Sequence, residues 1–327
     1  MHGFFTLRLS FAAITGLLVG CGNPQPKEPE VVPNRSTVVE QPTEAPTFSG
    51  TRAFLDLEKQ VSFGPRNPGS LGHSQCLNFL LSELRTLADT VWTQEFASVG
   101  YNNETLRLTN VVASFRPEEK SRILLCAHWD TRPRADNDPI PSNQSKPILG
   151  ANDGASGVAV LLELARLIHK TPPTIGIDMV LFDGEDYGYE GDTPRYLLGS
   201  RYFAANTKFQ HVPRFAILLD MIGDASLEIL KEQHSVRYAG DIVNIIWNTA
   251  RQLGYYQFVD VVGESITDDH LPLNEAGIKT VDLIDFDYPD NTNRYWHTLD
   301  DVPAHCSNES LEAVGTVLTH LLYSQKP

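Results

Sequence analysis

Three apolar segments of the sequence end in side chains that bind metals or transfer protons. "RILLCAH" ends at His128, and "FAILLD" ends at Asp220. "MVLFDGED" ends in the adjacent acids Glu185 and Asp186, and a further acid, Asp153, lies among small residues in "GANDGASG". Histidine nitrogen and carboxylate oxygen are ligands that zinc accepts. These residue types therefore indicate a metal centre in which one carboxylate stays free for proton transfer.

Each of these residues also has an ordinary structural explanation when it is taken alone. Asp153 has the residue type of a helix N-cap. The acids 185–186 are typical of a solvated turn, and His297 in "RYWHTLDD" has the surroundings of a structural histidine. Together they are more specific, because Asp153, Asp186 and His297 would supply three ligands to a zinc ion and leave one position open. Glu185 would then remain as a general acid and base.

The apolar segments alternate with amphipathic ones, which predicts an α/β fold with a central mixed, mostly parallel sheet and helices on both faces. In such sheets ligands bind beyond the carboxyl ends of the strands, where His128, the acids 185–186 and Asp220 would meet. The predicted strands cover residues 90–98, 107–115, 121–128, 176–186, 215–223 and 279–286. The predicted helices cover residues 51–63, 72–87, 157–170, 199–206, 241–255 and 309–325.

Six short motifs occur along the chain in the order "AHWD", "GANDGASG", "FDGED", "LLDMIG", "ITDDHLP" and "YWHTLDD". This series resembles the zinc exopeptidase superfamily, which includes di-zinc aminopeptidases and glutaminyl cyclases. The resemblance runs from about Phe54 to the C-terminus and implies a zinc aminopeptidase-like fold. "HWDTRPRADNDP", "YLLGSRYFA", "ITDDHLPL" and Trp296 directly before His297 are most similar to glutaminyl-peptide cyclotransferases. That branch implies conversion of the N-terminal Gln of a peptide or protein to pyroglutamate, with release of ammonia.

The resemblance implies roles for individual residues. Asp153, Asp186 and His297 would hold one zinc ion. Glu185 would be the acid and base of the reaction. Asp220 and Asp268 would form a hydrogen-bonded carboxylate pair beside the site.

The substrate pocket is expected to differ in detail from that of the animal cyclases. Trp296 would form part of its wall, as the resemblance implies. Asp186 stands where the animal enzymes have Glu. Those enzymes also have a pocket Trp a few residues after the acidic pair, whereas this chain has "YGYEGD" there. Tyr187 and Tyr189 are the candidates to replace that Trp.

Two other functions are compatible with parts of the sequence. A di-zinc aminopeptidase would bind a second zinc ion through His128, Asp153 and Asp220, with Asp130 orienting His128. All four residues are present, so the ligand set alone does not exclude this function. A non-catalytic binding lipoprotein would have lost the acid and base or a ligand, and this chain retains all of them.

The N-terminal residues indicate export and lipidation. An apolar stretch from Leu9 to Val19 is too short to span a bilayer and is typical of a signal peptide. It ends in "LVGC", which resembles a bacterial lipobox, so residues 1–20 would be removed and Cys21 lipidated. Residues 21–48 are predicted to form that anchor and a disordered, Pro-rich tether, and residues 49–327 a single zinc-dependent catalytic domain. The domain would then face the periplasm or the exterior from a membrane.

Composition narrows the range of partners. The net charge of −15 argues against binding to nucleic acid, which requires a basic surface. Apart from Cys21 the chain has three cysteines, Cys76, Cys126 and Cys306, which is too few for a disulfide framework. Cys126 lies in an apolar segment and is expected to be a buried hydrophobic residue. The expected partners are therefore the N-termini of peptides or proteins and a membrane.

Overall fold

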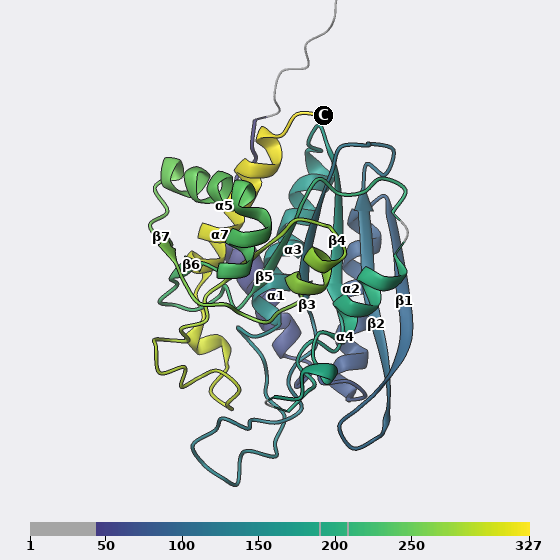
Figure 1. Cartoon of the computed structure of the whole chain (residues 1–327), viewed down its shortest axis with the longest axis vertical. Coiled ribbons are helices and arrows are strands. Elements are labelled where there is room, and N and C mark those ends of the chain that lie inside the picture. Colours follow the sequence, from purple (N-terminus) through teal and green to yellow (C-terminus); the bar gives the residue numbers. More distant parts are fainter. Residues whose placement is uncertain (1–43, 190, 208) are drawn as a thin grey trace, which may run out of the picture. The chain divides into compact units, whose positions relative to one another are not determined.

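A computed structural model describes residues 44–189, 191–207 and 209–327, which belong to one compact unit. Its main sheet has six strands in the order β1-β2-β4-β3-β5-β8 (Figure 1). The four strands β4, β3, β5 and β8 are parallel, whereas β2 pairs antiparallel with both β1 and β4. The bounds of these strands are β1 Thr90–Val99, β2 Thr105–Phe115, β3 Arg122–His128, β4 Gly176–Phe182, β5 Ala216–Asp220 and β8 Thr280–Ile284. The predicted α/β fold with a central mixed sheet is confirmed.

Helices cover both faces of this sheet. Figure 1 shows α4 beside β1 and β2, and α5 and α7 toward the opposite end of the sheet. Residues of α1, α3, α5 and α7 share the larger apolar core, while Phe203 of α4 and Leu273 of α6 belong to a smaller core on the other face. The helix bounds are α1 Gly50–Val61, α2 Leu71–Leu87, α3 Ala155–Lys170, α4 Leu198–Asn206, α5 Gln233–Leu253, α6 His270–Glu275 and α7 Asn308–Ser324.

Strand β3 shows why the central strands read as continuous apolar runs. Successive side chains of a strand point to opposite faces of the sheet. Leu125 and Ala127 enter the larger core, whereas Leu124 and Cys126 enter the smaller one. Because helices cover both faces, every residue of β3 is buried, and the strand has no polar alternation.

The connections around β3 and β5 create the crevice that positions the site. The chain leaves β3 through α3 and returns as β4, which pairs with one side of β3. On the other side of β3 lies β5, and β8 pairs with the outer side of β5. In open α/β sheets, ligands bind where neighbouring strands have connections running in opposite directions. His128 is the last residue of β3, and Asp220 is the last residue of β5. The two side chains therefore face the same crevice.

Several short elements were not predicted. β6 (Ile229–Lys231) and β7 (Phe258–Val262) form a separate two-stranded parallel sheet, and α6 has only six residues. Elements of this length contain too few residues to show a period of 2 or 3.6. α5 begins at Gln233 rather than at residue 241, and Ala239 has non-helical backbone angles inside it.

The start of the folded unit lies slightly before the predicted boundary at residue 49. Phe48 is 3% exposed and belongs to the larger core, so it is not part of a tether. Ala45 also packs partly against this core. The predicted signal peptide, Cys21 and the tether up to residue 43 lie outside the described residues.

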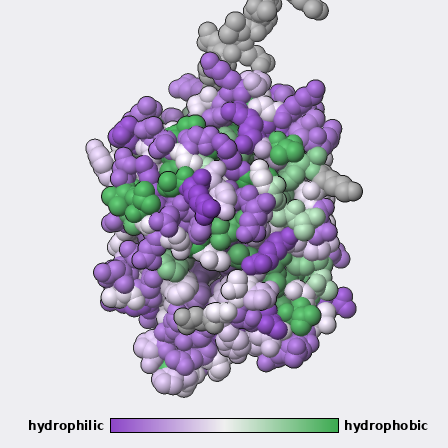
Figure 2. All heavy atoms as spheres, viewed as in Figure 1, coloured by the Kyte–Doolittle hydropathy of each residue, from purple (hydrophilic) through white to green (hydrophobic). Residues whose placement is uncertain are grey.

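Cys76, Cys126 and Cys306 are free and buried, so the part of the chain that the structure describes contains no disulfide. None of its helices is both long and apolar enough to cross a bilayer. On the face in Figure 2, hydrophilic residues predominate and apolar residues occur in separate small patches. Scattered apolar residues of this kind are normal on protein surfaces.

Candidate active site

A cavity of about 300 Å³ lies beyond the carboxyl ends of the central strands. Acidic residues and His297 line this cavity together with apolar and aromatic side chains. The lining residues are Asp153, Glu185, Asp186, Gly191, Thr193, Tyr196, Asp220, Met221, Glu264, Ser265, Ile266, Thr267, Asp268, Ile284, Phe286, Trp296 and His297. Six of the predicted site residues and the predicted wall residue Trp296 are therefore brought together from distant parts of the chain.

Asp153 enters the cavity from the loop before α3. The N-cap of α3 is Gly154 and makes no side-chain cap bond, so Asp153 is not the capping residue that its type suggested. The backbone N–H groups of Asn152 and Asp153 donate to Asp301 at 2.8 and 3.2 Å. Asp301, which is buried, thus fixes the loop and leaves the Asp153 carboxylate free to face the cavity.

Glycine is required next to Asp153. Gly154 has a φ of +106°, and a Cβ at this position would lie 2.5 Å from the carbonyl oxygen of Asp130 and 3.2 Å from Cε1 of His128. Residues with a side chain rarely adopt this backbone conformation. The small residues of "GANDGASG" therefore allow the loop to pack directly against the end of β3.

Asp153, Asp186 and His297 form the first group with the geometry of a metal centre. His297 Nε2 lies 3.6 Å from Asp153 Oδ2 and 3.4 Å from Asp186 Oδ2. Ligands about 2.0–2.1 Å from a tetrahedral zinc ion are about 3.3 Å apart, so this set fits zinc. Asp186 Oδ2 is buried and has no hydrogen-bond partner among the described residues, which is expected of a ligand atom.

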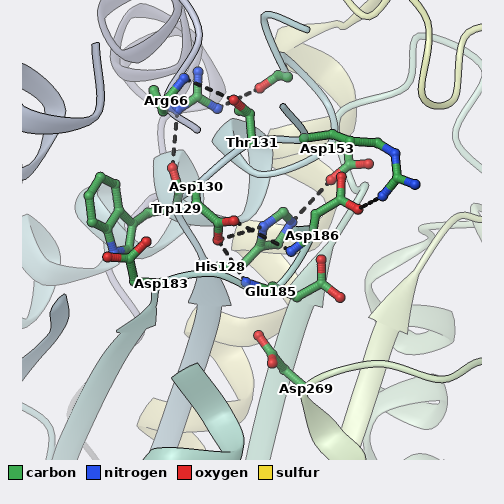
Figure 3. Close-up of polar contacts among 12 residues, drawn as sticks. Arg66, His128, Trp129, Asp130, Thr131, Asp153, Asp183, Glu185, Asp186 and Asp269 are labelled. Atoms are coloured by element: carbon green, nitrogen blue, oxygen red, sulfur yellow. Dashed lines mark hydrogen bonds and ion pairs between the residues drawn. The ribbon is translucent and has the colours of Figure 1, made fainter. Parts of the chain in front are cut away.

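His128, Asp153 and Asp220 form a second group with similar spacing. Figure 3 shows His128 between Asp130 and Asp153. His128 Nε2 lies 3.2 Å from Asp153 Oδ1 and 3.1 Å from Asp220 Oδ1, and its Nδ1 lies 3.6 Å from Asp130 Oδ1. Burial alone would lower the pKa of His128, but Asp220, Asp130 and Asp153 raise it well above its ordinary value. A proton on this imidazole therefore balances the surrounding carboxylates, and a metal ion bound there would have to displace it.

Glu185 lies beside both groups but belongs to neither. Its backbone N–H donates to Asp130 at 3.0 Å, which fixes the turn after β4, and its side chain is half-buried on the cavity wall (Figure 3). Burial raises the pKa of Glu185 well above its ordinary value; His128 opposes this shift, while Asp186 and Asp268 add to it. A raised pKa suits a carboxyl group that must accept and return a proton near neutral pH.

Asp220 and Asp268 both line the cavity. Asp268 accepts a hydrogen bond from the N–H of Asp269 at 2.5 Å, and its Oδ2 has no partner among the described residues. Burial raises the pKa of Asp268 well above its ordinary value, and the charge of Asp220 adds to this shift. The two acids are thus electrostatic neighbours in the cavity, and the hydrogen-bonded pair that the resemblance implied stays a prediction.

Tyr187 and Tyr189 are not among the residues that line the cavity, contrary to the prediction. Tyr187 packs with Leu106 and Leu108, and its hydroxyl donates to Glu104. Tyr189 is exposed and lies over the side chain of Arg134. The loop after the acidic pair turns away from the cavity before it returns.

The aromatic wall of the cavity comes from other positions. Tyr196, nine residues beyond Tyr187, enters the wall on the returning part of the loop. Trp296 lines the cavity as predicted and packs edge-on against Phe286 at 5.0 Å between ring centroids. Neither Tyr196 nor Phe286 was predicted, because no periodic pattern marks these loop positions.

Arg132 is the buried residue that sequence reasoning missed at the metal group. It is 1% exposed, and its Nη1 donates to Asp186 Oδ1. Burial alone would raise the pKa of Asp186, but Arg132 and His297 hold it below its ordinary value. The run "HWDTRPRADNDP" contained this arginine without any signal that distinguished it from Arg134.

Residues 110–322 match peptidase family M28, and this match covers more than half of the chain. The chain belongs to peptidase family M28. The solved structure of Tannerella forsythia glutaminyl cyclase is similar to it, with 41% identity, a TM-score of 0.82, and coverage of 86% of this chain and 100% of that one.

Two structures from Bacteroides thetaiotaomicron are similar to the same extent. A glutaminyl cyclase bound to N-acetylhistamine has 42% identity and a TM-score of 0.82, and covers 86% of this chain and 100% of its own. A protein described as a leucine aminopeptidase precursor has 42% identity and a TM-score of 0.82, and covers 86% of this chain and 99% of its own. The descriptions of the similar proteins thus name both a glutaminyl cyclase and an aminopeptidase.

Proposed function

We propose that this protein is a glutaminyl-peptide cyclotransferase, which converts the N-terminal glutamine of a peptide into pyroglutamate and ammonia. The observation that carries this proposal is the similarity to two glutaminyl cyclases, at 41% and 42% identity over 86% of this chain. The half-buried Glu185, free of either metal group, lies on the wall of the cavity beside Asp153, Asp186 and His297 and can supply the acid and base that the reaction needs.

The reaction forms one bond and breaks one. The α-amine of the substrate attacks the carbon of its own side-chain amide, and the bond from that carbon to the amide nitrogen breaks. The carboxylate of Glu185 accepts a proton from the attacking amine and delivers it to the departing nitrogen, which leaves as ammonia. Asp268, on the same wall, helps to keep the Glu185 carboxyl in its raised pKa range.

One zinc ion is proposed for Asp153, Asp186 and His297. When bound, zinc supplies Lewis-acid polarisation of the amide oxygen and stabilises the negative charge that develops there. Asp301 holds the ligand Asp153 in place, and Arg132 holds the ligand Asp186. In this arrangement His128 and Asp220 act as a hydrogen-bonded pair, with 3.1 Å between Nε2 and Oδ1.

The rest of the cavity fixes the substrate. The nucleophile and the electrophile belong to one residue, so the enzyme mainly selects a ring-forming conformation and excludes water. Trp296, Phe286, Ile266 and Tyr196 supply the apolar and aromatic wall for this purpose. A cavity of about 300 Å³ is large enough for one terminal residue, which suits the N-terminus of a peptide or protein as the substrate.

The second candidate function is a di-zinc aminopeptidase. The intact group of His128, Asp153 and Asp220, and the similarity to the leucine aminopeptidase precursor, favour it. A second zinc ion in that group would help to activate water as the nucleophile, and Glu185 would be the general base for that water.

For the N-terminal segment we propose a lipid anchor on Cys21, with residues 1–20 removed as a signal peptide. The lipobox-like "LVGC" after an apolar stretch supports this. The catalytic domain would then act outside the cytoplasm, on the periplasmic or exterior side of a membrane.

One experiment separates the two enzyme functions. The purified protein is incubated with two short peptides that differ only in an N-terminal Gln or Leu, and both are followed by mass spectrometry. Loss of ammonia from the Gln peptide with an intact Leu peptide is the result expected of the cyclotransferase. Release of free Leu would overturn it in favour of the aminopeptidase.

A further inference from the structure

Arg132 occupies an unusual position for a positively charged side chain. It is 1% exposed and lies directly behind Asp186, a proposed ligand of a cation. A buried charge is costly unless it is paired and hydrogen-bonded. Arg132 therefore needs partners, and these partners define what it does.

All three nitrogens of the Arg132 guanidinium donate hydrogen bonds. Nε and Nη2 donate to the two oxygens of Asp136 at 2.6 and 2.7 Å, which is a bidentate pair. Nη1 donates to Asp186 Oδ1. The ring of Tyr196, on the cavity wall, lies 5.5 Å from Cζ. Asp136 thus anchors the planar group so that its remaining edge faces Asp186.

This arrangement divides the two oxygens of Asp186 between two partners. Oδ1 accepts from Arg132, whereas Oδ2 has no hydrogen-bond partner among the residues that the structure describes and lies 3.4 Å from His297 Nε2. Only one oxygen of Asp186 is therefore available to a metal ion, and its direction is set.

We propose that Arg132 is a positioning residue that holds Asp186 as a one-oxygen metal ligand and couples it to the cavity wall at Tyr196. Arg132 acts through Asp186 and does not itself contact substrate. The inference rests on the proposed metal centre. It adds to the three proposed ligands a supporting group, Arg132, Asp136 and Tyr196, which keeps the ligand Asp186 in place.

Arg134 provides a matched control. It is also buried, also contacts Asp136, at 3.3 Å, and also binds the loop after β4, through the carbonyls of Tyr187 and Gly188. It makes no hydrogen bond or ion pair with Asp186 in the described structure. Loss of Arg134 therefore tests the contribution of general loop packing, without the contact to the ligand.

The test is zinc affinity, measured by competition with a chelator of known affinity on folded protein. Loss of an outer partner of a metal ligand typically weakens binding about 10–100-fold, and we expect that loss for Arg132→Met. Arg132→Lys should be intermediate, because an ammonium group cannot bind Asp136 and Asp186 in the forked geometry of arginine. Arg134→Met should keep an affinity close to that of the wild type.

The outcomes separate this inference from the metal centre on which it rests. Wild-type affinity in Arg132→Met, or an equal loss in Arg134→Met, would overturn the role of Arg132. If Arg132→Met does not fold, Arg132→Lys decides the question: a wild-type affinity in that variant overturns the proposal. Absence of any zinc that depends on His297 in the wild-type protein would instead show that the ligand assignment itself is wrong.

Discussion

At the scale of single residues, Glu185 is the group on which the proposed chemistry depends most directly. Glu185→Gln keeps the size of the side chain and removes its ability to accept a proton. We expect turnover of a Gln peptide to fall at least about 100-fold, within the range of general acid–base catalysis. Zinc content should stay at the wild-type level, because Glu185 belongs to neither metal group.

Ammonia release and elemental analysis measure these two properties on the same sample. Glu118→Gln, at an exposed position, is the matched control and should behave as the wild type. Wild-type turnover in Glu185→Gln would remove this residue from the mechanism. Loss of zinc would instead identify it as a ligand.

His297 tests the ligand set. It has a φ of +56°, which is a strained backbone conformation for a residue other than glycine, and such strain concentrates at functional sites. His297→Ala should lose both bound zinc and activity, as read by elemental analysis and ammonia release. His320→Ala, exposed on α7, is the control and should retain both. Full zinc occupancy in His297→Ala would contradict the assignment.

Residue types predicted the centre of the site well, but not its support. Asp153, Asp186 and Asp220 are recognisable because each directly follows, or closely adjoins, a strongly apolar segment. Arg132 and Asp301 are not, because their partners depend on how loops fold back over tens of residues. The same reason explains the error at Tyr187, since no local pattern shows which way the loop after β4 turns.

At the scale of elements, the junction of β3 and α3 determines whether the site forms. Gly154 stands at the N-cap of α3, packed against the backbone of Asp130. Any Cβ there pushes the loop away from the end of β3, where His128 and Asp130 lie. The geometry of the metal groups therefore depends on the close packing of the first turn of α3 against the end of β3.

Gly154→Ala should reduce both stability and zinc affinity. The unfavourable backbone conformation alone costs about 1–3 kcal/mol, and the contact with Asp130 adds to it. Gly254→Ala is the control, because Gly254 also has a positive φ, +82°, but has open space around it. Chemical denaturation should detect a loss in both variants, and chelator competition a loss in Gly154→Ala only. Equal zinc affinity in the two variants would contradict the proposed linkage.

The fold was predictable to the extent that its elements are long and buried. β3, β4, β5 and β8 are buried along their whole length, and β1 and β2 have ten and eleven residues, so the positions of all six strands agree closely with the prediction. Most of the helices also lie close to their predicted positions. β6, β7 and α6 are short, and tertiary contacts rather than local pattern define them. The early start of α5 has a similar cause, since Glu232 supplies its N-cap by accepting from His234 and Ser235.

At the scale of the whole molecule, the proposed anchor is a property of residues outside the described part. Cys21→Ser removes the proposed site of lipidation. The full-length variant should move from the membrane fraction to the soluble fraction of cells that express it, and its activity per molecule should be unchanged. Cys76→Ser is a control for thiol loss and should stay with the membrane. Membrane association of Cys21→Ser would exclude lipidation at this residue.

The N-terminal boundary of the folded unit can be tested by its effect on stability. Phe48 is buried, and its ring packs against Gly315 of α7, where any Cβ would overlap it. Ser49, the next residue, caps α1 by accepting from the N–H of Arg52 at 3.3 Å. A chain that starts at Ser49 therefore keeps the cap of α1 but loses a core side chain.

We expect a chain that starts at Ser49 to be less stable than one that starts at Glu44. Removal of a buried phenylalanine typically costs about 3–5 kcal/mol, so the difference in unfolding free energy should approach this range. Phe48→Ala in the longer chain is the decisive comparison, because it removes the ring and keeps the backbone. If that variant is as stable as its parent in urea denaturation, Phe48 does not belong to the core, and the domain begins at residue 49.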